Sequence, residues 1–147
     1  MVNIENILVN GPVSTKIIDA ENVKYEKMTD SGAHAVFLGQ VRADVIDGKT
    51  VDRIEYSAYP EMVKYEAEKI QKIIKSKYNQ VTNISVKHSI GGVKAGELSL
   101  YVRITSKHRK QAFDACIEIV ELIKDNFPVW KKEILEDGSY IWTENKK

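Results

Sequence analysis

Residues 98–128 read LSLYVRITSKHRKQAFDACIEIVELIKDNFP, and the hydrophobic period of this stretch changes in its middle. The first eight residues alternate apolar and polar side chains, which is typical of a strand with one buried face. From 107 to 126 the apolar residues recur at helical spacing, which predicts a long helix. Pro128 ends that helix, because the residue before a proline avoids the helical region. The buried helix stripe is predicted to comprise Ala112, Cys116, Ile119, Ile123 and Phe127.

The rest of the chain shows the same two patterns in a mixed order. Alternating apolar residues predict strands at 33–41, 53–58, 84–90, 129–135 and 139–143, with a short strand within 11–18. Helical patterns predict a helix at 21–30, with Asp19 as its N-cap, and a second long helix that begins at Pro60. Polar or glycine-rich connections are expected at 44–50, around Asp47-Gly48, and at 91–97. This order indicates an α+β fold with a mainly antiparallel sheet and two long helices.

The bulk properties predict a single domain over residues 1–147 in the cytoplasm. The net charge of +1 gives no global field that would attract nucleic acid or an anionic membrane, so anion binding must depend on a local cluster. Cys116 is the only cysteine, which excludes an intrachain disulfide and suits a reducing compartment. The N-terminus lacks the pattern of a signal peptide, and no apolar run reaches the roughly 20 residues that span a bilayer.

The segment SKHRK, residues 106–110, places basic side chains at a predicted helix start with Ser106 as the N-cap. Cations are unfavourable there unless an anion binds, because the first turn of a helix carries partial positive charge. Two interpretations remain open: an anion site that includes His108 and Arg109, or a solvated basic turn. Lys124, in the last turn of the same helix, either complements the helix dipole or belongs to a site.

The adjacent residues Lys131 and Lys132 must point to opposite faces if 129–135 is a strand. At most one of them can then lie in a given pocket, and we expect the other to pair with a carboxylate in solvent. Trp130 should share a face with Lys132. Arg42 ends the predicted strand 33–41 and is either a surface arginine or a ligand contact.

Several residues with possible chemistry have simpler interpretations. Cys116 lies on the buried stripe of its helix, so we expect an inert core thiol rather than a nucleophile. His88 lies on an apolar strand face, as a core histidine would. No spacing of His, Cys, Asp or Glu predicts a metal site, and no phosphate-binding loop or dinucleotide fingerprint is present, so we expect no metal and no cofactor.

Five stretches, taken together, resemble the large, catalytic subunit of molybdopterin synthase. They are GAHAVFLGQVR (32–42), EYSAYPEM (55–62), HSIGGVKAGE (88–97), ITSKHRKQAFDA (104–115) and LIKDNFPVWKKE (122–133). They follow the family's order and cover residues 32 to about 142. Gln40 departs from the pattern, since a basic residue is common before the Val-Arg pair. The resemblance implies the family's hammerhead-like α+β fold.

The resemblance also implies a sulfur-transfer reaction. A small ubiquitin-like partner would bring a C-terminal Gly-Gly thiocarboxylate, and two sulfurs would be placed in turn on cyclic pyranopterin monophosphate to form the dithiolene of molybdopterin. By this resemblance Lys124 and Lys131 flank the thiocarboxylate and are the catalytic candidates, Lys124 as acid/base and Lys131 as electrostatic partner. The residues implied to bind the pterin substrate and its phosphate are Gln40, Val41, Arg42, His108, Arg109, Lys132 and Glu133.

One geometric consequence follows from the predicted helix. Arg109 and Lys124 are fifteen positions apart in it, which corresponds to roughly 22 Å along the axis. A pterin monophosphate is too short to touch both residues. Either the helix breaks, or each pocket takes His108 and Arg109 from one subunit and Lys124 and Lys131 from another. We predict the second: a symmetric homodimer with composite sites, and a heterotetramer once each large subunit binds one small partner.

Two other classes of function remain as alternatives to sulfur transfer. A non-catalytic module that binds a phosphorylated metabolite would use the same basic helix start but could lose Lys124 and still bind. An RNA-binding domain would need aromatic platforms beside the basic residues and a more basic chain.

Overall fold

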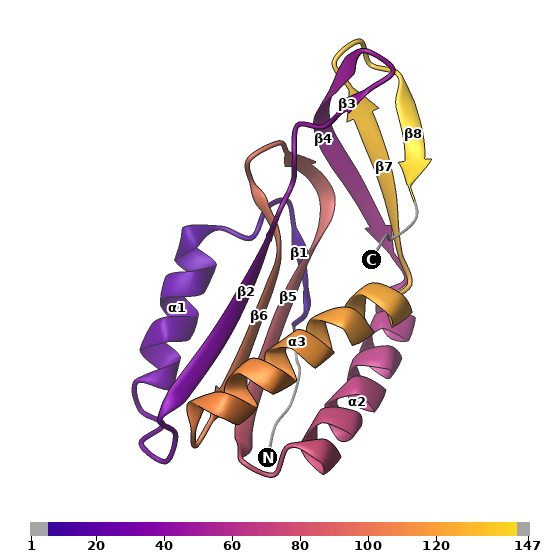
Figure 1. Ribbon diagram of the computed structural model, residues 1–147. Coiled ribbons are helices and arrows are strands. Elements are labelled where there is room, and N and C mark those ends of the chain that lie inside the picture. The colour runs from indigo at the N-terminus through magenta and orange to yellow at the C-terminus, as the bar shows by residue number, and fades with distance from the viewer. Residues whose placement is uncertain (1–5, 144–147) are drawn as a thin grey trace.

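The computed structural model describes residues 6–143, and in that range three helices pack against an eight-stranded sheet (Figure 1). The helices are α1 (Thr15–Tyr25), α2 (Pro60–Lys77) and α3 (Arg109–Asn126). The strands are β1 (Leu8–Asn10), β2 (Ala33–Gln40), β3 (Val45–Ile46), β4 (Lys49–Ala58), β5 (Val81–Lys94), β6 (Leu98–Ser106), β7 (Val129–Leu135) and β8 (Tyr140–Thr143).

The sheet has the order β2-β6-β5-β4-β7-β8, with β1 beside β5 and β3 beside β4. The β1–β5 pair is parallel, and the other strand pairs of the described chain are antiparallel. The prediction of an α+β fold with a mainly antiparallel sheet and two long helices is therefore confirmed. Strand β4 lies at the centre, because it pairs with β5 through one half and with β7 along most of its length.

Helices α2 and α3 cover one face of the sheet and enclose the main core (Figure 1). The alternation in β6 puts Leu100, Val102 and Ile104 on this face, each no more than 1 % exposed. Ile74 of α2 and Ile119 of α3 are fully buried against them. Each such side chain contributes roughly 1.5–3 kcal/mol through burial, so this layer holds the sheet and the two helices together.

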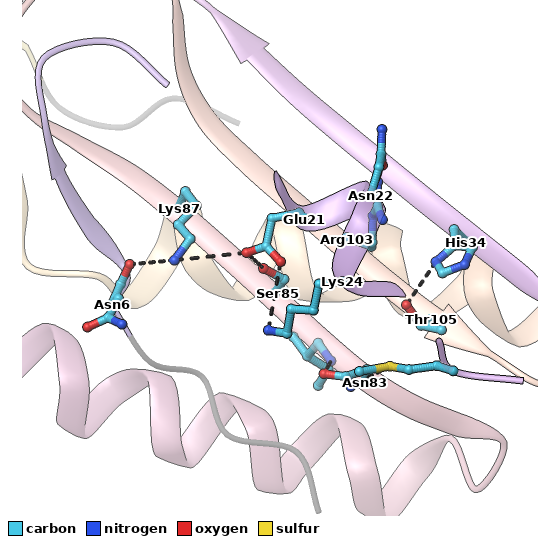
Figure 2. Close-up of polar contacts among 12 residues, drawn as sticks. Asn6, Glu21, Asn22, Lys24, His34, Asn83, Ser85, Lys87, Arg103 and Thr105 are labelled. Carbon is cyan, nitrogen blue, oxygen red and sulfur yellow. Dashed lines mark hydrogen bonds and ion pairs between the residues drawn. The ribbon is translucent and has the colours of Figure 1, made fainter. Parts of the chain in front are cut away.

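Helix α1 lies on the opposite face (Figure 1), where polar contacts hold it (Figure 2). The carboxylate of Glu21 accepts a hydrogen bond of 2.9 Å from the hydroxyl of Ser85 on β5. Arg103 on β6 donates to the side-chain oxygen of Asn22, and its guanidinium lies 4.9 Å from the ring centroid of Tyr25. These contacts use the residues of β5 and β6 that alternate with the core positions.

The N-terminal predictions were wrong in detail. Residues 11–18 contain no strand within the described structure, because Gly11 turns the chain with a φ of +75° and α1 begins at Thr15. Ser14, not Asp19, occupies the N-cap, and the helix ends at Tyr25 rather than near residue 30. The strand here is β1, which pairs with β5 just before this turn.

Helix α3 begins two residues later than the sequence predicted. His108 occupies the N-cap position, because Ser106 still pairs in the sheet with Ala33 and its hydroxyl donates to the carbonyl of Gln80. The turn predicted at 91–97 is also shorter than expected, since β5 continues through Lys94. The loop at 44–50 forms a small hairpin, β3–β4, and its turn is at Asp47-Gly48 as predicted.

Strands β3, β7 and β8 extend the sheet beyond the ends of the helices, together with part of β4 (Figure 1). We call these four strands the distal sheet. A second small core lies where β4 meets the end of β5 and the residue after β2, and it comprises Val41, Tyr56 and Val93. Among the helices described in residues 6–143, none combines the length and the apolar composition of a membrane-spanning helix.

Candidate active site

A pocket of about 970 Å³ lies between the main sheet, the end of α3 and the distal sheet. Most of the strands around it contribute side chains, and α3 contributes one residue from its last turn. The lining residues are Phe37, Leu38, Gly39, Gln40, Val41, Arg42, Asp44, Val45, Ile46, Ile54, Tyr56, Ser99, Lys124, Lys131, Glu133, Ile141, Trp142 and Thr143.

Lys124 and Lys131 enter this pocket from two consecutive elements. Lys124 is in the last turn of α3, and the helix ends at the buried Phe127 before Pro128. Strand β7 starts at Val129, so alternation directs Lys131 to the pocket side. Only Phe127 and Pro128 separate the two elements, and Lys131 is near enough for the charge of Lys124 to act on it.

Both lysines have lowered pKa values. Burial lowers the pKa of Lys131 to about 8, and the positive charge of Lys124 adds to the shift while Glu133 opposes it. Burial also lowers the pKa of Lys124. A desolvated amine near a second cation gives up its proton more readily than a surface lysine. Lys131 can therefore exchange protons close to neutral pH, which a proton-transfer role requires, and Lys124 loses its proton more readily than an exposed lysine.

The end of β2 supplies a third cation. Val41 is buried, and its backbone bonds to Glu97 and Gly96, which fixes the strand end. Arg42 follows and forms a 3.1 Å ion pair with Asp44 at the exposed rim of the pocket. The structure thus brings Gln40, Val41, Arg42 and Glu133 together with the two lysines, as the sequence predicted for one site.

Three of the sequence-predicted site residues lie elsewhere in the single chain. His108 and Arg109 are exposed at the N-terminal end of α3, which runs without a break to Asn126, so they lie roughly 22 Å from Lys124. Lys132 faces away from the pocket, as alternation predicted. Its ammonium lies 4.0 Å from the ring centroid of Tyr140. The expected carboxylate partner of Lys132 is not found among the described residues.

Sequence reasoning missed the neutral wall of the pocket. Tyr56 and Ser99 line it and are each 7 % exposed, and the Tyr56 hydroxyl donates a 3.0 Å hydrogen bond to the Ser99 hydroxyl. His88 packs edge-on against Tyr56, with ring centroids 5.4 Å apart. Asp44 and Trp142 were also missed. The alternation in β4 and β6 placed Tyr56 and Ser99 on particular faces, but it could not show that these faces meet.

Other candidates for chemistry lie outside the pocket. Cys116 is buried, and burial raises the pKa of its thiol, which agrees with the predicted core role. Within residues 6–143 no group of three or more His, Cys, Asp or Glu side chains could hold a metal ion.

The sequence and the fold match one family of proteins. The sequence model of the MoaE family, described as MoaE protein, matches residues 13–126. The molybdopterin synthase catalytic subunit of Dictyostelium discoideum is 41% identical over 130 residues, which cover 86% of this chain and 81% of that protein. The subunit of the same name from Pyrococcus abyssi is 32% identical over 140 residues, which cover 95% of this chain and 91% of that protein.

Two solved structures show the same fold. The crystal structure of molybdopterin synthase from Staphylococcus aureus aligns with a TM-score of 0.76 at 30% identity and covers 97% of this chain and 94% of that one. A complex of subunits 1 and 2 of the molybdopterin-converting factor from Helicobacter pylori aligns with a TM-score of 0.79 at 23% identity. That alignment covers 96% of this chain and 91% of that one.

Proposed function

This chain belongs to the MoaE family, the catalytic subunits of molybdopterin synthase, and we propose that its pocket is where sulfur is transferred. The protein is a sulfurtransferase of molybdopterin biosynthesis. The donor is the C-terminal thiocarboxylate of a small partner subunit, and the acceptor is cyclic pyranopterin monophosphate. One observation carries this proposal: Lys124 and Lys131, both with lowered pKa values, share one pocket with Arg42.

The charges of the pocket suit these reactants. A thiocarboxylate and a phosphate ester are both anions, and negative charge develops on oxygen as the sulfur is transferred. Lys131 stabilises that charge, because a preorganised cation in a partly desolvated site acts strongly on it. Lys124 acts as the acid/base. The sulfur arrives on the partner, so the subunit needs no cysteine nucleophile, and the buried position of Cys116 is consistent with that.

The proposed site requires a second copy of this chain. One side of α3 carries Arg109, Phe113, Ile117 and Lys124 in succession. Phe113 is 60% exposed and Ile117 is 69% exposed, which is unusual for large apolar residues on a packed helix. We call Phe113 and Ile117 the α3 apolar stripe. It separates the basic start of the helix from its lysine end.

Two α3 helices packed antiparallel through this stripe would cover it. The two-fold axis would pass between Cys116 and Ile117, halfway between Arg109 and Lys124 in the sequence. His108 and Arg109 of one subunit would then reach Lys124 of the partner subunit. In this arrangement His108 and Arg109 bind the phosphate, with Arg42, Gln40, Val41 and Glu133 beside the pterin. Lys132, which faces away from the pocket, takes no part in binding within this chain.

The test is a reconstitution with the small subunit in its thiocarboxylate form and cyclic pyranopterin monophosphate. We expect dithiolene product with the wild-type chain and a loss of at least 100-fold for Lys124→Ala, the scale of acid–base catalysis. Lys72→Ala, on the exposed side of α2, is the matched control and should retain full activity. Product formation by Lys124→Ala at the wild-type rate would remove the basis of the proposal.

A further inference from the structure

The polar groups on the neutral wall of the pocket are not explained by the lysine chemistry. Tyr56 of β4 and Ser99 of β6 come from strands that are not adjacent in the sheet, yet their hydroxyls meet at 3.0 Å inside the pocket. In the backbone register Tyr56 is the direct partner of Lys131. The hydroxyl pair therefore lies on the wall beside the lysine that the reaction uses.

The direction of this hydrogen bond leaves one donor available. The Tyr56 hydroxyl keeps its proton at neutral pH, because burial raises its pKa. It donates that proton to the oxygen of Ser99. A serine hydroxyl has one proton of its own, and among the residues that the structure describes Ser99 donates it to no protein group.

His88 holds the ring of Tyr56 in place. Its ring packs against the edge of His88, and the ring nitrogen Nδ1 of His88 lies 2.8 Å from the backbone oxygen of Ser89. A carbonyl only accepts, so Nδ1 carries the proton in this contact. His88 is 5 % exposed, and this anchored ring prevents Tyr56 from turning away from Ser99.

We propose that Ser99 donates its hydroxyl proton in a hydrogen bond to the oxygen of the partner's thiocarboxylate end, and that Tyr56 is a positioning residue that holds Ser99 for this contact. The assignment rests on the proposed function and extends it to two neutral residues. A neutral donor adds direction to the binding of an anion without adding a further positive charge beside Lys124 and Lys131. Accepting from Tyr56 also strengthens Ser99 as a donor, because linked hydrogen bonds polarise one another.

The test is a double-mutant cycle with Ser99→Ala and Tyr56→Phe, each of which removes one hydroxyl without adding volume. The readout is the Kd for the small subunit of the same organism with a plain Gly-Gly carboxylate, together with KM for each reactant. Ser99→Ala should weaken binding of the small subunit about tenfold, the scale of one hydrogen bond to a charged acceptor. Tyr56→Phe should weaken it less, and should add nothing in the Ser99→Ala background.

Two controls separate this contact from general effects. Ser57→Ala removes an exposed hydroxyl of β4 outside the pocket, and Tyr101→Phe removes a buried hydroxyl that has no hydrogen-bond partner among the described residues. Both should bind the small subunit as the wild type does. Additive losses in the cycle, an unchanged Kd for Ser99→Ala, or a change in KM for the pterin alone would overturn the assignment. Wild-type protein that fails to bind the small subunit would overturn the proposed function as well.

Discussion

Lys131 and Lys132 are neighbours in β7, but their side chains have different surroundings because they lie on opposite faces of the strand. Lys131 is partly buried beside Lys124, whereas Lys132 lies over the ring of Tyr140. Alternation along a strand predicted from the sequence that the two would separate. It could not predict the pKa of Lys131, because that value depends on the helix end and the other strands that enclose the pocket.

Replacing Lys131 should stabilise the protein while inactivating it. The pKa of Lys131 falls from 10.5 to about 8 on folding, so the unfolded chain binds more protons between these values and stability rises with pH across that window. Below pH 8 Lys131 is charged in the folded protein, so the full free-energy cost of burying that charge remains. We expect Lys131→Met to raise the free energy of unfolding at pH 7 by about 1–2 kcal/mol, with solvent screening of a partly exposed group taken into account.

Urea denaturation at pH 7 and pH 10 measures this effect. The gain should shrink at the higher pH, and the exposed control Lys72→Met should show neither the gain nor the pH dependence. A variant at position 131 that is less stable than the wild type at pH 7 would contradict the assignment of the burial cost.

His88 makes stability depend on acid. Burial lowers its pKa from 6.5 to about 4, so the unfolded chain binds the extra proton first as the pH falls. The folded protein keeps His88 neutral, so the contribution of this residue to the free energy of unfolding is fully present above pH 6.5. That contribution is lost progressively as the pH falls towards 4. Between pH 7 and pH 4.5 the wild type should lose about 2–3 kcal/mol more than His88→Gln, measured by urea denaturation. Equal losses in the two proteins would exclude His88 as the acid-sensitive group.

At the scale of elements, the periodic patterns predicted most of the structure. The strand 98–105 and the helix that follows it, the strands expected at 129–135 and 139–143 and the helix that starts at Pro60 are all present. The errors lie at the N-terminus, at the end of β5 and at the start of α3, where pairing with a distant strand decides the boundary. The hydrophobic pattern also did not predict an interface at Phe113 and Ile117. It identifies the buried stripe of the helix, but it does not show what covers apolar residues outside that stripe.

The α3 apolar stripe gives a prediction about assembly. Ile117→Glu places a charge at the proposed two-fold axis, next to the same residue of the second copy. Like charges held close together oppose association. We expect the variant to remain folded but to sediment as a monomer at concentrations where the wild type is a dimer, with loss of activity. Val23→Glu, at an exposed apolar position on α1, is the control and should remain dimeric. A dimeric Ile117→Glu protein would place the interface elsewhere.

At the scale of the whole molecule, the pocket draws on β2, on β4 and on the consecutive elements β6, α3 and β7, so its residues come from three separate parts of the sequence. No local pattern could bring Arg42, Ser99 and Lys131 together, and here the sequence predicted a shared site only through resemblance. The length of α3 separates His108 and Arg109 from the pocket of their own chain. Whether these two residues bind substrate therefore depends on how two chains assemble.

Mixing two inactive variants tests this composite arrangement. In a mixture of Arg109→Ala and Lys124→Ala chains, half of the dimers are mixed, and each mixed dimer has one intact site and one site that lacks both residues. Activity should therefore recover to about one quarter of the wild-type value. Activity that stays at the sum of the two separate variants after subunit exchange would show that each pocket is complete within one chain.

The two adjacent lysines of β7 also determine which side chain would face the pocket if the register of this strand shifted. A slip of one residue turns every side chain of a strand to the other face. If β7 lost one residue after Pro128, Lys132 would move opposite Tyr56, the place that Lys131 holds now. The pocket would keep a lysine ammonium group, while the ring of Tyr140 would lose the ammonium group that now lies over it. With two adjacent lysines the pocket would therefore keep a cation after the deletion of one residue, whereas a single lysine between two apolar residues would be lost from it.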